Sequence, residues 1–218
     1  MWTHQYTTLS PRTCFVLDDG HGTAVGYVIG TPDVHAFARA YPRYVDEVLT
    51  RGHGAAAVPA PAQLAVPEPW WVAAVDPPSP PDGAGAGTGE GTPTPAASAT
   101  TRTVNEACLA QLAHHPRWLL LEGVPGKAEL AAAYRATMHI DLLDAYQGRG
   151  WGRKMIERFV ESVGAAVAEA DGALDPGRGL HIGVSGENTK VVPFYERVGF
   201  TTYPGGEAEG NVWMVRAL

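Results

Sequence analysis

The stretch AYQGRGWGRKM, residues 145–155, places the strongest constraint on how this chain can fold. Its glycines and cations are Gly148, Gly150, Gly152, Arg149, Arg153 and Lys154. The apolar run MHIDLL precedes it, and KMIERFVESVGAAVAEA follows it with apolar residues at helical spacing. The sequence therefore predicts a strand, a glycine-rich turn and the start of a helix.

Such a junction is suited to binding an anion. The first N–H groups of a helix have no partner within the helix, and the helix dipole favours negative charge beside them. Glycine lets a ligand approach the backbone closely, so we expect a phosphate or a diphosphate here. The loop lacks the Gly-Lys-Ser/Thr ending of a Walker motif, and it reads GxGxG instead of the dinucleotide-binding GxGxxG. On its own, the loop is also compatible with a turn that merely needs flexibility.

Composition narrows the class of protein. The chain has 218 residues, enough for one good core or two small ones, and a net charge of −7. This acidity argues against a broad surface for nucleic acid or membrane. Cys14 and Cys108 lie far apart, which excludes a disulfide framework and a CxxC metal site, and we expect two reduced, buried thiols and no metal. Without a membrane-length apolar run or a signal peptide, a cytoplasmic protein is expected.

The chain divides into three parts. Residues 1–51 predict a hairpin, with strands at 14–17 and 24–29, followed by a helix at 33–49. Residues 52–103 are rich in Pro, Gly and Ala, and most of this insert is expected to be disordered. Trp70 and Trp71 are expected to attach its first part to the domain.

Residues 104–218 continue the same domain. They predict helices at 104–113, 127–135, 153–170 and 189–198, and strands at 138–143, 180–185, 200–203 and 211–218. RWLLLEGV is expected to be a strand or an extended connector. From residue 138 onward the order is β–α–β–α–β–β, with the first two strands parallel.

Two motifs together resemble the GNAT superfamily of N-acetyltransferases. QGRGWG, residues 147–152, matches the Q/R-x-x-G-x-G/A loop of that family. Asn188, Tyr195 and the pair Gly199-Phe200 match its second motif, in the same order along the chain. The wording HIDLL-x-x-YQGRGWGRK and GYVIGTPD is similar to the acetyltransferase-like domain of bacteria and fungi, also found at the C-terminal end of animal O-GlcNAc hydrolases. The resemblance covers roughly residues 12–50 and 104–218.

The resemblance implies an α/β fold, the GNAT fold, whose mixed central sheet is flanked by helices and has two splayed parallel strands. MHIDLL and LHIGVS would be those strands, and acetyl-CoA would bind between them as a co-substrate. Leu142 and Leu143 would pair with its pantetheine arm through their backbone, as a strand added to a sheet does. The other residues expected to bind it are Gln147, Gly148, Arg149, Gly150, Trp151, Gly152, Arg153 and Asn188.

The resemblance also implies roles in catalysis. Tyr195 would be the general acid that protonates the departing thiolate, and Asp141 is our candidate for the base, with Glu187 second. The alternatives are a core tyrosine for Tyr195, a helix cap for Asn188 and a solvated carboxylate for Glu187. His139 is interpreted as a packed strand residue.

The implied function is transfer of acetyl from acetyl-CoA to a primary amine by direct attack in a ternary complex. The alternative is a non-catalytic CoA-binding or interaction domain, and a weaker one is nucleotide binding; a homodimer also stays open. Family members begin with a strand and two helices, whereas only residues 1–13 precede Cys14. In the family these elements form one wall of the acceptor groove. We therefore expect that wall to be missing here, to be encoded upstream, or to be replaced by the N-terminal arm and the Trp70-Trp71 region.

Overall fold

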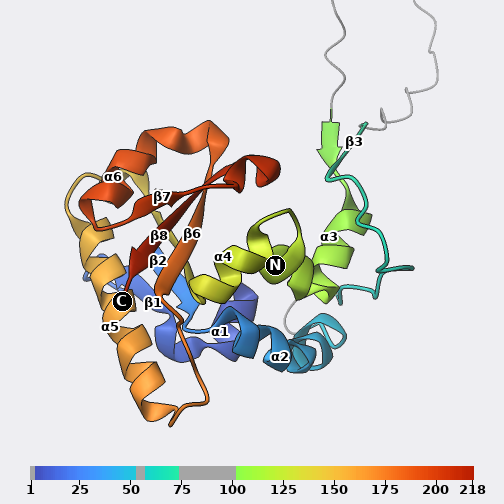
Figure 1. The fold of residues 1–218 in the computed structure, drawn as a ribbon, viewed down its shortest axis with the longest axis horizontal. Coiled ribbons are helices and arrows are strands. Elements are labelled where there is room, and N and C mark those ends of the chain that lie inside the picture. Colours follow the sequence, from blue (N-terminus) through green and yellow to red (C-terminus); the bar gives the residue numbers. More distant parts are fainter. Residues whose placement is uncertain (1–2, 53–56, 74–101) are drawn as a thin grey trace, which may run out of the picture.

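A computed structural model describes residues 3–52, 57–73 and 102–218 (Figure 1). Its helices are α1 (His4–Leu9), α2 (Val34–Tyr44), α3 (Glu106–His114), α4 (Lys127–Ala133), α5 (Trp151–Glu169) and α6 (Val192–Arg197). Its strands are β1 (Phe15–Asp18), β2 (Ala24–Thr31), β3 (Trp71–Ala73), β4 (Arg102–Val104), β5 (Ala136–Leu142), β6 (Gly179–Ser185), β7 (Thr201–Tyr203) and β8 (Asn211–Ala217). Short 3-10 or π-helical turns are η1 (Pro11–Thr13), η2 (Val45–Leu49), η3 (Trp118–Glu122), η4 (Asp144–Tyr146), η5 (Gly186–Val191) and η6 (Gly206–Glu209).

A six-stranded sheet forms the centre of the molecule, in the order β1-β2-β5-β6-β8-β7. Within this sheet β5 and β6 run parallel, and the other neighbouring strands run antiparallel. A parallel pair needs a crossover connection, which α5 provides. The β–α–β–α–β–β order and the parallel pairing expected from the sequence are confirmed. The fold is a mixed α/β fold whose central sheet is flanked by helices.

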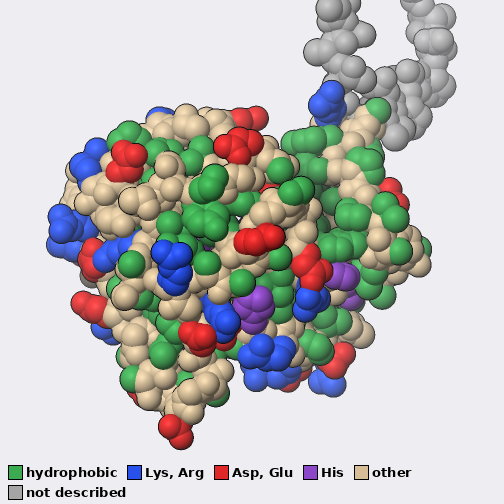
Figure 2. Space-filling view, viewed as in Figure 1, with side chains coloured by type: hydrophobic (Ala, Val, Ile, Leu, Met, Phe, Trp, Pro, Cys, Tyr) green, Lys and Arg blue, Asp and Glu red, His purple; other side chains and the backbone are tan. Residues whose placement is uncertain are grey.

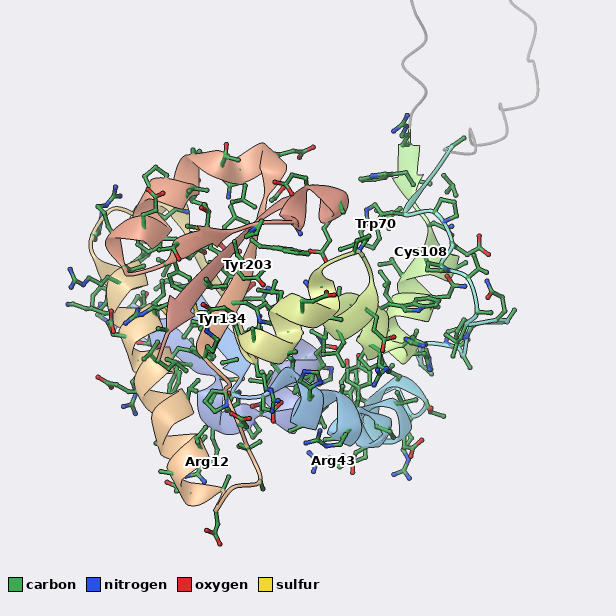
Figure 3. The ribbon with its side chains drawn as sticks, viewed as in Figure 1. Arg12, Arg43, Trp70, Cys108, Tyr134 and Tyr203 are labelled. Atoms are coloured by element: carbon green, nitrogen blue, oxygen red, sulfur yellow. The ribbon has the colours of Figure 1, made fainter. Side chains whose placement is uncertain are left out.

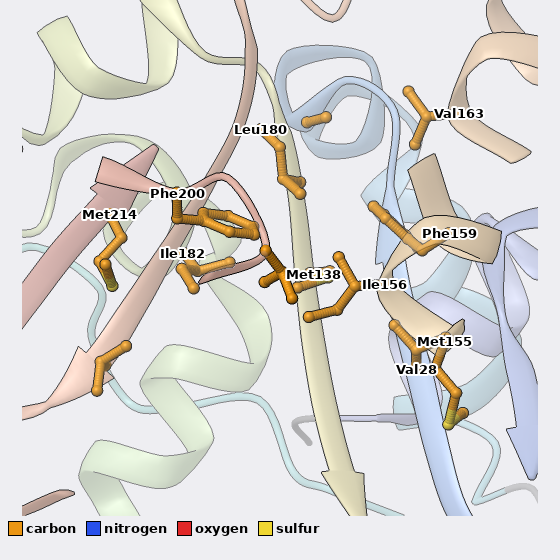
Figure 4. Packing of buried hydrophobic residues seen from close by; sticks show 13 residues of the cluster. Val28, Met138, Met155, Ile156, Phe159, Val163, Leu180, Ile182, Phe200 and Met214 are labelled. Carbon is orange, nitrogen blue, oxygen red and sulfur yellow. The ribbon is translucent and has the colours of Figure 1, made fainter. Parts of the chain in front are cut away.

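Helix α5 covers one face of the sheet with an apolar stripe. Met155, Ile156, Phe159 and Val163 recur at helical spacing and are all buried against β2, β5, β6 and β8 (Figure 4). Phe159 lies so close to β2 that a Cβ added at Gly30 would be 2.7 Å from its ring. This packing fixes the position of α5, and therefore of the glycine turn at its start.

The opposite face is covered by α1, α2, α4 and η3, which lie across the sheet from α5 (Figure 1). Tyr6 of α1 is fully buried and stacks on Phe37 of α2, with the ring centroids 5.0 Å apart. The residues before β1 therefore include a helix that packs on this face of the sheet.

Residues 57–73 run along α3, and Gln111 supplies three of the hydrogen bonds that hold them. Gln111 accepts a hydrogen bond from the N–H of Glu68 at 2.7 Å and donates to the carbonyls of Gln63 and Val66 at 3.1 Å. The side chain of Trp71 is 51% exposed, while its backbone pairs with Val104 in the ladder between β3 and β4. Figure 3 places Trp70 on the same side as Cys108 in α3, away from the central sheet. The disorder expected for the insert concerns residues 74–101, which lie outside the described ranges.

Several predicted elements differ from the structure. RWLLLEGV is helical where a strand or connector was expected, because Trp118–Glu122 form η3 and bury Leu120 and Leu121 beside α2. A short buried apolar run fits either conformation, and only the tertiary packing decides. Helix α5 begins at Trp151, two residues before the predicted start, and β4 begins inside the predicted insert at Arg102.

Several expectations about chemistry can be compared with the described residues. Cys14 and Cys108 are free cysteines; Cys108 is buried and Cys14 is half-buried. Among the helices of the described ranges, none has the length and apolarity needed to cross a membrane. In the same ranges, no group of three or more His, Cys, Asp or Glu residues is arranged to hold a metal ion.

Candidate ligand-binding site

A cavity of about 600 Å³ opens where β5 and β6 part. The ladder between these strands consists of Ala136 opposite Leu180 and Thr137 opposite His181, at the start of each strand. Beyond it the cavity lies between the end of β5, the glycine turn, η5 and α6. Its lining residues are Ile140, Asp141, Leu142, Asp144, Gln147, Gly148, Gly150, Gly152, Asn188, Lys190, Val191, Phe194, Tyr195 and Arg197.

The pairing of β5 with β2 decides which backbone groups face this cavity. The N–H of Leu143 donates to the carbonyl of Val25 at 3.0 Å, and the carbonyl of Leu143 accepts from the N–H of Tyr146 at 2.8 Å. In an antiparallel pair, successive residues direct their peptide groups alternately toward the partner strand and away from it. The peptide groups of Ile140 and Leu142 therefore point toward β6. Of the expected pair, Leu142 directs its peptide groups toward the gap, whereas those of Leu143 are bonded to Val25 and Tyr146.

The other side of the gap follows from the pairing of β6 with β8. The N–H of Gly186 donates to the carbonyl of Gly210 at 2.8 Å, so the same alternation turns Gly183 and Ser185 toward β5. Backbone donors and acceptors thus border the gap on both sides. An extended ligand that carries amide groups could bind there as an added strand does.

Two side chains already occupy the peptide groups of Leu142. Its N–H donates to Oδ1 of Asp141 at 2.9 Å, and its carbonyl accepts from Nε2 of Gln147 at 2.9 Å. Nε2 of Gln147 also donates to Oδ1 of Asp144 at 3.0 Å. Asp141 and Gln147, both predicted site residues, are thereby brought together at the edge of the cavity.

The glycine turn leaves open space before α5. Gly148 and Gly150 have φ angles of 69° and 80°, a conformation that glycine adopts readily and other residues rarely. A Cβ at either position would find no atom within 4 Å. Gly150 is the N-cap of α5 and supplies no side-chain hydrogen bond, so the first N–H groups of the helix remain available. Gly152 instead serves packing, because a Cβ there would lie 2.9 Å from the ring of Phe194.

The side chains of Arg149, Trp151 and Arg153 do not line the cavity, although the sequence predicted them to bind its ligand. Arg149 lies over the ring of Tyr146, 5.8 Å from its centroid, and Lys154 lies 4.4 Å over Trp151. These residues can act on an anion through backbone N–H groups or through charge at longer range. Figure 2 shows Lys and Arg side chains along the edge of the molecule formed by α5 and α6.

Lys190 and Arg197 line the cavity and were not predicted. They lie on η5 and α6, the segment that also carries Asn188 and Tyr195. The sequence contained a signal for them, since cations close to two candidate site residues on one short helical segment are expected to share their surroundings. The cavity is therefore bordered by positive charge on the α6 side as well as by the helix start of α5.

Tyr195 extends from α6 into the same cavity. Its ring contacts Phe194 and Phe200, with centroids 5.2 and 5.5 Å away. Burial, and secondarily the negative charge of Asp141, raise the pKa of the phenol. Tyr195 therefore stays protonated at neutral pH and can donate a proton inside the cavity. Phe200 is buried in the core as expected, whereas Phe194 packs at the core edge and also lines the cavity.

Asn188 lines the cavity and is not a helix cap. Ser185 caps η5 instead, its Oγ accepting from the N–H of Glu187 at 3.3 Å. Asn188 has a non-helical backbone within η5, with φ −118° and ψ 30°. Glu187 is exposed and lies outside the cavity lining, which favours its interpretation as a solvated carboxylate.

His139 lies on β5 two residues before Asp141, on the same side of the strand. Its Nε2 is 3.4 Å from the hydroxyl of Tyr6, and part of the side chain stays exposed. Desolvation by neighbouring atoms, and then the charge of Lys127, lower the pKa of His139. The imidazole is therefore neutral at pH 7. It contacts α1 as a packed residue does, but it is not enclosed.

Comparison with solved structures finds chains of similar fold. No protein-family model matches the chain. The structure is similar to the crystal structure of SsHAT, with 28% sequence identity and a TM-score of 0.60. The match covers 99% of this chain and 77% of that one. The two proteins thus share the mixed α/β architecture over nearly the whole length of this chain.

Proposed function

We propose that this protein is an acetyltransferase of the GNAT type that moves acetyl from acetyl-CoA to a primary amine. The observation that carries the proposal is the cavity between two parting parallel strands, which ends at an uncapped helix start behind a glycine turn. The two halves of this site suit two halves of one ligand: an amide-bearing arm between the strands and a diphosphate at the helix.

The residues present fit such a ligand. Ile140 and Leu142 offer backbone groups toward the arm, and Gly148 and Gly150 leave open space for the diphosphate. Lys190 and Arg197 on the facing wall carry positive charge that complements an anionic ligand. Asn188, at the turn into α6, is positioned to hydrogen-bond the arm.

The proposed reaction is a direct attack within a ternary complex. The amine nitrogen bonds to the acetyl carbon and the carbon–sulfur bond breaks. Tyr195 gives its phenolic proton to the departing sulfur, and Asp141 takes a proton from the nitrogen. The raised pKa of Tyr195 favours the protonated state that this role needs.

Two further points support the proposal. The letters HAT in SsHAT are in use as an abbreviation of histone acetyltransferase. The sequence similarity to the acetyltransferase-like domain of O-GlcNAc hydrolases and its bacterial and fungal relatives rests in part on residues that line the same cavity, among them Asp141, Gln147 and Gly148.

The test is thermal unfolding of the whole chain with and without acetyl-CoA. A ligand held only by the native state stabilises it by about 2.7 kcal/mol at a hundredfold excess over Kd. We expect Gly150→Glu to abolish this stabilisation, because its carboxylate would stand at the anion site. Gly172→Glu is the matched control: Gly172 follows the other end of α5 with φ 83° and equally open space, but it lies outside the cavity lining.

Each outcome separates the candidate functions. Stabilisation lost in Gly150→Glu and kept in Gly172→Glu would support the CoA site, and an amine screen for transfer with sequential kinetics would follow. Binding without turnover over a broad amine panel would favour the non-catalytic alternative. Displacement by ATP would favour a general nucleotide site. No shift for the wild-type chain would contradict the proposal.

A further inference from the structure

The gap between β5 and β6 is closed at one point by the protein's own side chains. Leu142 directs its peptide groups into the gap, yet its N–H is bonded to Asp141 and its carbonyl to Gln147, each at 2.9 Å. Both partner atoms belong to residues that line the cavity. A strand-like ligand that pairs with Leu142 must therefore take the places of these two atoms.

The replacement is chemically matched. Oδ1 of Asp141 accepts a hydrogen bond where a ligand carbonyl would accept, and Nε2 of Gln147 donates where a ligand N–H would donate. Each exchange replaces a hydrogen bond within the protein by one to the ligand. The net contribution of a single hydrogen bond is about 1 kcal/mol. By contrast, the N–H of Leu143 is bonded within the sheet, to Val25, and is not available for exchange. Asp141 and Gln147 thus act as displaceable caps on Leu142, one of the two residues that offer backbone groups to the ligand.

Displacement changes the hydrogen bonding of Asp141. In the free protein Oδ1 of its carboxylate accepts the N–H of Leu142. After displacement it loses that donor and remains beside Tyr27 and Tyr195, the two phenols whose pKa values are raised by burial and then by its charge. Asp144, which also lines the cavity, is bonded to Gln147 and not to Asp141.

We propose that Asp141 and Gln147 cap the peptide groups of Leu142 in the free protein, and that the arm of the acyl donor displaces both caps when it binds. This inference rests on the proposed function.

The test is the affinity for CoA, measured by titration calorimetry on the full chain. Asp141→Asn removes the charge and keeps an oxygen that can cap Leu142, whereas Asp141→Ala removes the charge and the cap. Both variants lack the negative charge of Asp141, so both lose its repulsion of the anionic ligand equally. Because only the alanine variant has no cap to displace, we expect it to bind CoA about fivefold tighter than the asparagine variant, which corresponds to one net hydrogen bond.

The outcomes are distinct from those of the proposed function. If the wild-type chain binds no CoA, the proposed function itself is contradicted. If it binds CoA and the two variants have equal affinities, or the alanine variant binds more weakly, Asp141 is not a displaceable cap and this inference is wrong. Asp141→Val, which also lacks an acceptor and suits a strand, replaces the alanine variant if that one fails to fold.

Discussion

The two faces of the central sheet are stabilised in different ways. Toward α5, apolar side chains such as Ile156, Phe159 and Met214 form the cluster between the helix and the sheet. On the opposite face, buried polar groups stand among the apolar ones, and several are paired: Thr137 donates to the carbonyl of His181 at 3.0 Å, and Nδ1 of His181 donates to the carbonyl of Tyr134 at 2.6 Å. The α5 face gains stability from burial, whereas the other face fixes its arrangement through directed bonds.

This difference bears on the candidate site. The turn at the start of α5 needs a helix that does not shift, and non-directional packing over a long stripe supplies that. The opposite face carries His139 and Asp141 at the parting of β5 and β6, where directed bonds keep the polar groups in register. Lys127 illustrates the same point: it is 8% exposed and pairs with Glu209 at 3.1 Å, which in turn accepts from the indole of Trp213 at 2.8 Å.

The largest expected effect comes from breaking the apolar face. Phe159→Ala removes a fully buried ring between α5 and β2 and leaves a cavity, so we expect a loss of about 3–5 kcal/mol in the free energy of unfolding. Urea unfolding measures it, with the midpoint lowered and the slope m unchanged. Phe159→Leu keeps most of the volume and should cost less than about 1.5 kcal/mol. Equal costs for the two variants would contradict a tightly packed α5 face.

The polar face should reveal itself through pH. Burial, and then the charge of Lys127, lower the pKa of His181 to about 4. The unfolded chain, with a His pKa of about 6.5, binds a proton more readily between these values, so stability falls as pH decreases from about 6.5 to 4. The expected loss is roughly 3 kcal/mol, smaller than that for Phe159→Ala.

The measurement is a set of chemical unfolding curves from pH 7 to pH 4, compared between wild type and His181→Gln. Carboxylates titrate in both proteins, so the difference between the two curves isolates the histidine. We expect the difference to shrink as the pH falls, because protonation penalises only the wild type. Parallel curves would show that His181 is not held neutral in the fold.

The features that could be predicted from the sequence depend on neighbouring residues, and those that were missed depend on contacts between distant segments. The turn at 147–152 and the apolar stripe of α5 are local features, set by glycine conformation and helical spacing, and both were predicted. The side toward which Ile140 and Leu143 direct their peptide groups was not predicted. That direction depends on pairing with β2, more than a hundred residues away in the chain. Along a strand, residues i and i+2 direct their peptide groups to the same side. Which of the two alternating sets faces the cavity is decided only by the partner strand.

Other misses have the same physical cause. RWLLLEGV carries no period that separates a strand from a helical turn, and its burial beside α2 decides. Residues 57–70 looked like part of a structureless insert, yet Gln111 pairs with their backbone from α3, a contact between distant segments. Lys190 and Arg197 line the cavity because η5 and α6 fold over its edge, and their closeness in sequence to Asn188 and Tyr195 was the one local signal for this.

The smallest expected difference is between two helix caps. It compares capping hydrogen bonds on the polar face of the sheet with those away from it. Asp33 caps α2, with Oδ1 accepting from the N–H groups of His35 and Ala36 at 2.8 and 3.1 Å. It is 2% exposed, and its Oδ2 accepts from the N–H of Asp175 at 3.3 Å, which ties α2 to the connection after α5. Asn105 caps α3 through a single bond to the N–H of Ala107 at 3.0 Å and is only half-buried.

Replacing either cap by alanine should cost between about 0.5 and 2 kcal/mol of unfolding free energy, with Asp33→Ala near the upper end and Asn105→Ala near the lower. The reason is that Asp33→Ala leaves buried N–H groups without an acceptor, while water can reach those released by Asn105→Ala. Asp33→Asn keeps the acceptor oxygen and should recover most of the loss. Thermal unfolding of the three variants side by side measures the contrast. Equal losses of unfolding free energy in the two alanine variants would mean that burying the hydrogen bonds of Asp33 adds no stability. In that case the polar face would be held by its apolar contacts alone.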